Sequence, residues 1–238
     1  MNLPNHIVVV PDGNRRWAKK RGWPSFFGHR EGAKTTGKIL EAALDLKIPY
    51  FTFWGTSLDN VTKRPSSEVK FLLNLFERDF KKLIKDKKIY QNGVKVNVFG
   101  RWEKLFPEKT KKAIKEAIEK TKNHKNCQLT FLLAYSGVDE MASAIQRIAK
   151  IKNQNAKIKI DEKLIKNNLW TKDLPAVDLM IRTGGERQGW SHFSSGLMMW
   201  DMADAQFYFT KNLFPDFSVA EFKKVIAQYS QTKRKMGA

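Results

Sequence analysis

The chain has 238 residues, 42% of them hydrophobic and 29% charged, which is the composition of a folded globular protein rather than a disordered one. Its formal net charge of +20 raises the question of whether the protein binds an anionic partner. The single cysteine, Cys127, excludes an internal disulfide framework, and we interpret it as buried packing. No apolar run has the length of a signal-peptide core or a membrane span, so we expect a cytoplasmic protein whose only membrane contact is peripheral.

Short apolar runs alternate with longer amphipathic segments along the chain. Strands are predicted at 7–10, 50–54, 94–99, 129–133 and 177–181. Helices are predicted at 30–46, 66–86, 107–122, 138–152 and 161–169, and a last one begins at Ser218, which has capping-box spacing to Glu221. This alternation predicts an α/β fold with a mostly parallel central sheet covered by helices, in a single domain that spans residues 1–238.

The positive charge is unevenly distributed. Residues 81–125 hold 15 basic and 5 acidic side chains, and residues 147–172 hold 8 and 2. These lysine-rich stretches carry apolar residues at helical spacing, so we interpret them as solvated helix faces and expect no specific nucleic-acid partner. Seven of the 11 arginines instead lie in or beside motif-like segments. Because a guanidinium group binds phosphate oxygens bidentately, this bias predicts a phosphate site.

Asp12, Thr56-Ser57 and Arg182 each follow a predicted strand directly. The carboxyl ends of parallel strands share one edge of a sheet, where ligands gather, so we expect these residues to lie together. The first segment, 11–17, contains Asp12-Gly13-Asn14-Arg15-Arg16 and opens a helix. Glycine permits close backbone approach, arginine binds phosphate, and a carboxylate becomes useful there through a bridging magnesium ion. A plain turn with Asp12 as helix N-cap explains the spacing equally well.

Two further segments carry polar groups suited to a diphosphate. The second contains Thr56-Ser57-Leu58-Asp59-Asn60 and Arg64, and the third contains Asp178, Arg182, Arg187 and Ser191 around a Gly-Gly turn. Polar loops and glycine turns of this kind are also common without a ligand. His29 is likewise open to two interpretations, as a structural histidine or as a ligand contact.

Taken together, these segments resemble the cis-prenyltransferase family, specifically the undecaprenyl diphosphate synthases, from residue 6 to residue 237. The family's first signature, His-x(4 or 5)-Asp-Gly-Asn-x-Arg-Trp-Ala followed by Gly-His, is matched by 6–18 and 28–29. Its second is matched by Ser57-x-Asp59-Asn60 and Arg64-Pro65-x-x-Glu68, and its third by Asp178-Leu-x-Ile-Arg182-Thr-Gly-Gly-Glu186. The Asp-Asp-x-x-Asp motif of the all-trans prenyl synthases does not occur.

The resemblance implies a homodimeric, magnesium-dependent enzyme that adds isopentenyl diphosphate to an allylic diphosphate, farnesyl or geranylgeranyl, and forms a long polyprenyl diphosphate. It implies a hydrophobic tunnel, walled partly by helix 66–86, and Gly55 in place of a bulky residue favours a long product. The implied catalytic residues are Asp12, Ser57 and Asn60, and the implied metal ligands are Asp12 and Gln206. The implied substrate-binding residues are Gly13, Asn14, Arg15, Arg16, Trp17, His29, Leu58, Asp59, Arg64, Arg182, Arg187 and Ser191.

The chain departs from the family pattern at several positions. Ser25 replaces an arginine that usually precedes Gly-His, and the segment 186–200 is longer than the family's. Gln206 replaces a glutamate that serves the family as a second metal ligand, often across a dimer interface, and Asp201 or Asp204 are candidates to compensate. These departures leave an alternative open, in which the chain is a weakly active or non-catalytic subunit of a heteromeric synthase.

Overall fold

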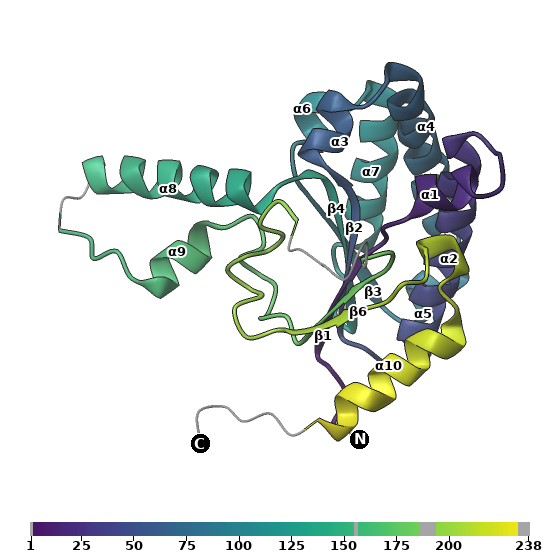
Figure 1. Ribbon diagram of the computed structural model, residues 1–238. Helices are drawn as coiled ribbons and strands as arrows, with labels where there is room; N and C mark the ends of the chain where they lie inside the picture. The colour runs from purple at the N-terminus through teal and green to yellow at the C-terminus, as the bar shows by residue number, and fades with distance from the viewer. Residues whose placement is uncertain (1, 155–156, 186–193, 233–238) are drawn as a thin grey trace.

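The computed structural model describes residues 2–154, 157–185 and 194–232. Its centre is one parallel sheet with the strand order β3-β4-β2-β1-β5-β6 (Figure 1). The strands are β1 (His6–Val10), β2 (Tyr50–Ser57), β3 (Val94–Phe99), β4 (Cys127–Tyr135), β5 (Leu179–Arg182) and β6 (Gln206–Phe209). The five predicted strands are confirmed within a few residues at their ends, whereas β6 was not predicted.

The predicted helices are also confirmed, with shorter helices added between them. The helices are α1 (Asn14–Lys19), α2 (Ser25–Asp45), α3 (Leu58–Lys63), α4 (Ser66–Leu83), α5 (Lys87–Gln91), α6 (Trp102–Leu105), α7 (Glu108–Thr121), α8 (Gly137–Gln154), α9 (Glu162–Asn168), α10 (Val219–Gln231) and a short 3-10 helix, η1 (Phe214–Asp216). Within the described part of the chain, no helix combines the length and apolar character that a bilayer span requires.

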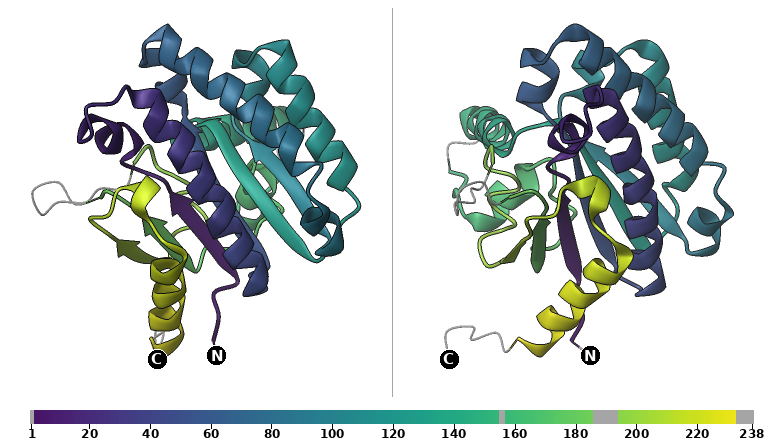
Figure 2. Two further views of the ribbon diagram at one scale, coloured as in Figure 1. Left: turned by 90° about the vertical axis from the view of Figure 1, so that its right-hand side faces the viewer. Right: turned by 45° about the vertical axis from the view of Figure 1, so that its right-hand side comes forward.

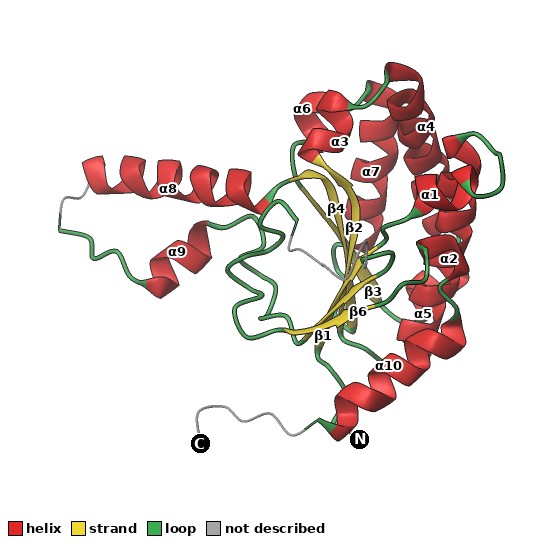
Figure 3. Cartoon of the chain, viewed as in Figure 1, coloured by secondary structure: helices red, strands yellow, loops and turns green. Residues whose placement is uncertain are grey.

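Both faces of the sheet are buried, because alternate side chains of each strand point to opposite sides. On β1, Ile7 and Val9 pack with α2 and α10, whereas Val8 and Val10 pack against the segment around Leu197–Met202. Figure 3 shows the difference between the two sides, with helices massed on one and loops crossing the other. Helices α8 and α9 project away from the sheet, on the side opposite α2 and α4 (Figure 1).

The lysine-rich helix α7 has the solvated face that its sequence predicts. Three of its lysines, and Lys122 directly after its end, pair with nearby glutamates, in Lys111–Glu108, Lys115–Glu103, Lys120–Glu116 and Lys122–Glu119, while Ala113, Ile114 and Ala117 are buried. Ion pairs of this kind are expected on a solvated helix surface.

The predicted capping box at the start of α10 is half confirmed. The Ser218 hydroxyl accepts a hydrogen bond from the Glu221 N–H at 3.0 Å. The Glu221 carboxylate does not complete the box with Ser218. It accepts hydrogen bonds from Thr210 Oγ1 and Asn212 Nδ2 instead, which ties the helix to the segment that follows β6.

Candidate active site

The three polar segments meet at one edge of the sheet, as predicted. Strand β1 lies between β2 and β5, and Val10 at its end is in register with Arg182. Asp12 follows β1, Thr56 and Ser57 end β2, and Arg182 ends β5. All three strands run in the same direction, so their carboxyl ends present these side chains side by side.

Asp12 is held between two arginines. Its carboxylate lies 3.1 Å from Arg16 Nη2 and 3.0 Å from Arg182 Nη2, and we call these three residues the open cluster. The interpretation of Asp12 as a helix N-cap is wrong: Gly13 occupies the N-cap position, and in the described part of the chain no side chain caps α1. The first-turn N–H groups are therefore not taken by a capping side chain. Because 37% of the Asp12 side chain is exposed, a ligand can reach it.

The turn after β5 closes around the same cluster. Arg16 donates to the carbonyl of Gly184 at 2.7 Å, and the Thr183 hydroxyl donates to the Asp12 carbonyl at 2.9 Å. Gly184 has a positive φ of 58°, and a Cβ there would lie 2.7 Å from Arg16 Nη2. The glycine turn thus brings the backbone close enough to fix the Arg16 side chain.

Asn14 lies at the contact between α1 and α2. Its amide donates to the Pro11 carbonyl, and its Oδ1 is a buried acceptor without a hydrogen-bond partner among the described residues. A Cβ on Gly28 would lie 1.9 Å from the Asn14 carbonyl, and one on Gly32 would lie 2.2 Å from Oδ1. These two glycines, one helical turn apart, make room for Asn14. A buried acceptor without a hydrogen-bond partner at a cavity wall marks a position where a ligand or water can donate the missing hydrogen bond.

A second polar group lies beside the open cluster. His29 Nε2 lies 3.1 Å from Glu68 Oε1, which also accepts from Arg64 Nη1 at 2.8 Å. Burial, opposed by the hydrogen bond to Glu68 and assisted by the charges of Arg64 and Arg15, lowers the pKa of His29. Burial and the Arg15 charge also lower the pKa of Arg64, whose Nε is buried without a partner within the described residues. The charges of Arg15 and Arg64 thus lie close together here, and the Nε of Arg64 is a donor that a ligand can use.

Glu68 was not among the residues predicted for the site. The available signal was the signature Arg64-Pro65-x-x-Glu68, which contains both residues, although Arg64 itself precedes the helix that begins at Ser66. The carboxylate holds His29 and Arg64 together, within reach of the Arg15 charge.

The second segment contributes less direct chemistry than expected. The Ser57 hydroxyl accepts from the Asn60 N–H at 3.1 Å and so caps α3. Leu58 packs partly against the core beside α4 and α7. Asp59 is exposed and pairs with Lys63 at 2.9 Å, which makes it a surface ion pair in this structure. The Trp17 indole donates to Asp216 at 2.6 Å, so its described role is to fasten α1 to η1.

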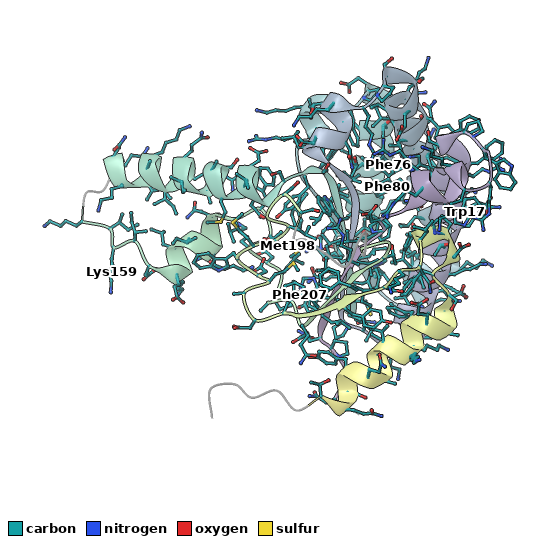
Figure 4. All side chains as sticks on the ribbon, in the orientation of Figure 1. Trp17, Phe76, Phe80, Lys159, Met198 and Phe207 are labelled. Carbon is teal, nitrogen blue, oxygen red and sulfur yellow. The ribbon has the colours of Figure 1, made fainter. Side chains whose placement is uncertain are left out.

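An apolar cavity of about 460 Å³ begins at this edge and runs between α2, α4 and the sheet. Asn14 and His29 line its polar end, and Ile89, Val94 and Cys127 lie among the residues at the far end. Its walls include Ala33, Leu40, Phe51, Phe53, Gly55, Leu72, Leu75, Phe76, Phe80, Leu83, Leu129 and Phe131. Figure 4 shows Phe76 and Phe80 projecting from α4 toward the interior. Cys127, expected as buried packing, is half-buried at this cavity.

Helix α4 contributes to both the cavity and the core. Leu72, Leu75, Phe76 and Phe80 line the cavity, whereas Leu73 and Ile84 pack with α7 in the core.

The predicted metal ligands do not lie together within one chain. Gln206 begins β6 opposite Leu179, at the amino end of the sheet, whereas Asp12 follows the carboxyl end of β1. The candidate Asp201 pairs with Lys166 and accepts from Thr171 Oγ1, and only 4% of it is exposed. Within one chain, neither residue can share a metal ion with Asp12. In the described residues, no three His, Cys, Asp or Glu side chains are grouped as a metal site.

Asp201 belongs instead to a set of bonded side chains that we call the closed cluster, which consists of the buried Tyr135, Glu140, Thr171 and Asp201 and the partly exposed Lys166. Glu140 accepts from the Tyr135 hydroxyl and from both the N–H and the hydroxyl of Thr171. Burial raises the pKa of Glu140 and of Asp201, although hydrogen bonds to each oppose the shift. Every member is engaged, so the cluster is structural.

The third segment is described only in part. Arg182 donates to Asp12 and, at 2.7 Å, to Ser194 Oγ. Arg187 and Ser191 lie outside the described residues.

Comparison with known proteins agrees with this geometry. Residues 10–237 match the family model described as "Putative undecaprenyl diphosphate synthase". The chain is 37% identical to a geranylgeranyl-diphosphate-specific tritrans,polycis-undecaprenyl-diphosphate synthase of Thermococcus kodakarensis, over 99% of this chain and 88% of that protein. It is 38% identical to an isoprenyl transferase of Halalkalibacterium halodurans, over 99% and 89%.

The fold is shared with solved structures of related enzymes. A lavandulyl diphosphate synthase from Lavandula x intermedia, in complex with dimethylallyl diphosphate, superposes with a TM-score of 0.85 at 30% identity, covering 99% of each chain. A probable undecaprenyl diphosphate synthase from Campylobacter jejuni superposes with a TM-score of 0.78 at 27% identity, covering 100% of each. This chain therefore belongs to the undecaprenyl diphosphate synthase family, which is a family of cis-prenyltransferases.

Proposed function

We propose that the chain transfers isopentenyl units from isopentenyl diphosphate onto an allylic diphosphate, forming a cis double bond at each addition and a long-chain polyprenyl diphosphate. The observation that carries this proposal is the position of the polar edge at the head of an apolar cavity of about 460 Å³. A diphosphate with a hydrocarbon tail has the same division into a charged head and an apolar body.

The described residues suggest how the two ends are bound. Arg15, Arg64 and His29, with the uncapped first turn of α1, offer donors to the allylic diphosphate. Arg182 and Arg16 offer a second cationic position next to Asp12, which suits isopentenyl diphosphate. In each addition the allylic C1–O bond breaks, C4 of isopentenyl diphosphate bonds to C1, and a proton leaves C2. The arginines stabilise the negative charge that grows on the departing pyrophosphate.

The donor set at Asp12 fits a magnesium ion. Magnesium takes one or two carboxylates together with phosphate oxygens and water, rather than an all-protein cage, and Asp12 is a reachable carboxylate beside phosphate-binding arginines. Asp12 would hold the ion, which would neutralise charge on the leaving pyrophosphate. A metal role for Gln206 would require the Asp12 site of another chain, and its neutral amide is a weaker ligand than a carboxylate.

Asn60 and Ser57 are proposed to position substrate. The Ser57 cap fixes the first turn of α3, and Asn60 lies in that turn. A side-chain amide is too weak a base to accept the C2 proton, so pyrophosphate is the proposed acceptor and Asn60 orients substrate or water.

The cavity suggests a long product. Gly55 lies on its wall, and a side chain there would enter it or displace Leu133, whose Cδ2 would be 2.6 Å from an added Cβ. The names of the archaeal relatives favour geranylgeranyl diphosphate as primer. The alternative, a non-catalytic subunit, is not favoured, since the relatives are named as synthases and transferases.

Incubation with geranylgeranyl or farnesyl diphosphate, labelled isopentenyl diphosphate and magnesium tests the proposal. We expect label in butanol-extractable products that carry several added units, and loss of that label with EDTA. If no allylic primer yields a labelled product, the proposal is wrong.

We also propose a homodimer. Helix α8 projects from the body with Val138 and Ile145 about 60% exposed, and Phe207 on the edge strand β6 is 49% exposed (Figure 4). Exposed apolar groups on a projecting helix and on an edge strand of the described sheet suit a symmetric partner. Light scattering should give twice the chain mass, and the double variant Ile145→Asp/Phe207→Asp should give the monomer.

A further inference from the structure

Two aromatic rings are exposed at the end of α2 nearest the active site. Trp23, in the loop after α1, is 48% exposed, and Phe26, in the first turn of α2, is 41% exposed. Both rest on other rings: Trp23 packs edge-on against Trp17 at 5.7 Å, and Phe26 stacks on Phe27 at 4.7 Å. Phe26 also lies 5.5 Å from Phe71 of α4. We call Trp23 and Phe26, with the rings beneath them, the aromatic lip. Its exposed rings are held in place rather than loose on the surface.

The aromatic lip lies within the most consistently basic part of the described chain. Residues 14–34 contain seven basic side chains and one acidic one. Lys19 and Lys20 are exposed, and the guanidinium groups of Arg21 and Arg30 lie over the rings of Trp17 and Phe27. Arg21, Arg30 and Lys34 lie in ion pairs, as the lysines of α7 do, but here the charge is accompanied by exposed aromatic surface.

The position of the aromatic lip is also informative. Figures 1 and 2 show the loop between α1 and α2 projecting from the body beside α2, away from α8. His29, one helical turn after Phe26, lines the apolar cavity, and Phe71 brings α4 to the same place. The lip therefore borders the cavity at the end where the polar residues lie.

We propose that the aromatic lip docks the protein on an anionic lipid surface, with Trp23 and Phe26 at the headgroup level and Lys19, Lys20 and their neighbours facing the lipid phosphates. Amphipathic rings favour the membrane–water interface, and each nearby lysine or arginine adds attraction to an anionic leaflet. Single-stranded nucleic acid also binds aromatic and basic surfaces, but it needs ring faces free for stacking, and Phe26 already stacks on Phe27. The inference adds a partner to the proposed function.

The test is flotation with vesicles in 0.15 M salt, without substrate. Vesicles of phosphatidylcholine alone are compared with vesicles that also contain phosphatidylglycerol. Lys19→Glu/Lys20→Glu tests the charge, and Lys223→Glu/Lys224→Glu, an adjacent exposed pair on α10, is its matched control. Trp23→Ser/Phe26→Ser tests the rings, and Leu105→Ser/Ile160→Ser, at 41% and 50% exposure, is the matched apolar control.

We expect the wild type to bind the anionic vesicles and to float poorly with neutral ones. The charge reversal should weaken binding at least about 30-fold, which is the loss expected from two lysines before the repulsion of two added carboxylates. The serine variant should weaken binding about tenfold, while both controls bind as the wild type does. Equal losses in lip and control variants would overturn the proposal, because they would assign binding to overall charge. So would no vesicle binding, or lip-dependent binding of a labelled oligonucleotide alone.

Stability is measured for each variant by thermal melting. If the serine variant is unstable, the Lys19→Glu/Lys20→Glu variant tests the proposal instead, since both lysine side chains are exposed. Failure of the turnover assay would refute the proposed function and leave this result standing, and failure here would leave turnover untouched.

Discussion

Two clusters in this molecule combine a carboxylate with cationic groups, yet they differ in what they can do. The open cluster places Asp12 between Arg16 and Arg182, with 37% of the Asp12 side chain exposed. The closed cluster holds Glu140 and Asp201 at 3% and 4% exposure, each with several hydrogen bonds inside the protein. Residue type alone does not separate them. Accessibility does, because a carboxylate that must bind a ligand has to keep part of its surface free.

The same contrast explains why Asp201, a candidate for a second metal ligand, differs from Asp12. Asp201 bonds to Lys166 and Thr171, and through Thr171 it is linked to Glu140. This network ties α8 to the segment that covers one face of the sheet. Removing a member should damage the fold, whereas removing Asp12 should damage the chemistry.

The largest expected effect follows replacement of Asp12 by alanine. Turnover should fall about 1,000-fold, since the change removes the proposed metal-binding carboxylate and the partner of both arginines. The melting temperature should stay within a few degrees, because a partly exposed ion pair adds little stability. Initial rates of labelled isopentenyl incorporation, with melting curves, give both values. Retained turnover would show that Asp12 is not essential.

Replacement of Glu140 by alanine should have the opposite pattern. It leaves the Thr171 N–H and the Tyr135 hydroxyl without their acceptor in a buried place, and should lower the free energy of unfolding by about 3 kcal/mol. Activity per folded molecule should be kept. Urea titration measures the change, with Glu108→Ala, at 89% exposure, as the matched control that should change little. A Glu140 variant of normal stability but no turnover would place Glu140 in the active site.

The smallest expected effect concerns pH. His6 is fully buried, with Nδ1 near the Pro175 carbonyl and Nε2 near Thr52 Oγ1, and burial lowers its pKa to about 4 from 6.5. Because the unfolded chain binds the proton more readily, His6 costs no stability above pH 6.5 and reduces it as the pH falls from 6.5 toward 4. The loss is about 2 kcal/mol by pH 5.

Urea titrations of the wild type and His6→Gln at pH 7 and pH 5 isolate the contribution of His6 to the pH dependence of the free energy of unfolding. The stability of the variant should fall less between the two pH values than that of the wild type. The raised pKa values of Glu140 and Asp201 act in the opposite direction, so the difference between the two proteins is the quantity to compare. An equal fall in both would exclude His6 as an acid-sensitive group.

Most of the fold was predictable because its signals are local. The apolar strands and the periodic helices follow from side-chain order, and residues that directly follow strands, such as Asp12 and Arg182, must share an edge in a parallel sheet. Strand β6 was missed because it is a short edge strand whose sequence, Gln206–Phe209, carries little alternation. Its pairing with β5 is a tertiary contact.

The meeting of the candidate residues at one edge of the sheet was predictable, whereas most of their contacts were not. Spacing cannot tell that Gly32 leaves room for Asn14, or that Glu68 joins His29 to Arg64, because these pairs come from different helices. It also could not tell that Gln206 and Asp12 lie at opposite ends of the sheet, since strand register decides that distance.

A structure of the complex with magnesium and an uncleavable thiolo analogue of geranylgeranyl diphosphate tests the central claim most directly. The account predicts the diphosphate within hydrogen-bonding distance of Arg15, Arg64 or His29, the metal ion on Asp12, and the prenyl chain in the cavity between α2 and α4. A diphosphate bound away from Arg15, Arg64 and His29, or a prenyl chain outside that cavity, would contradict it.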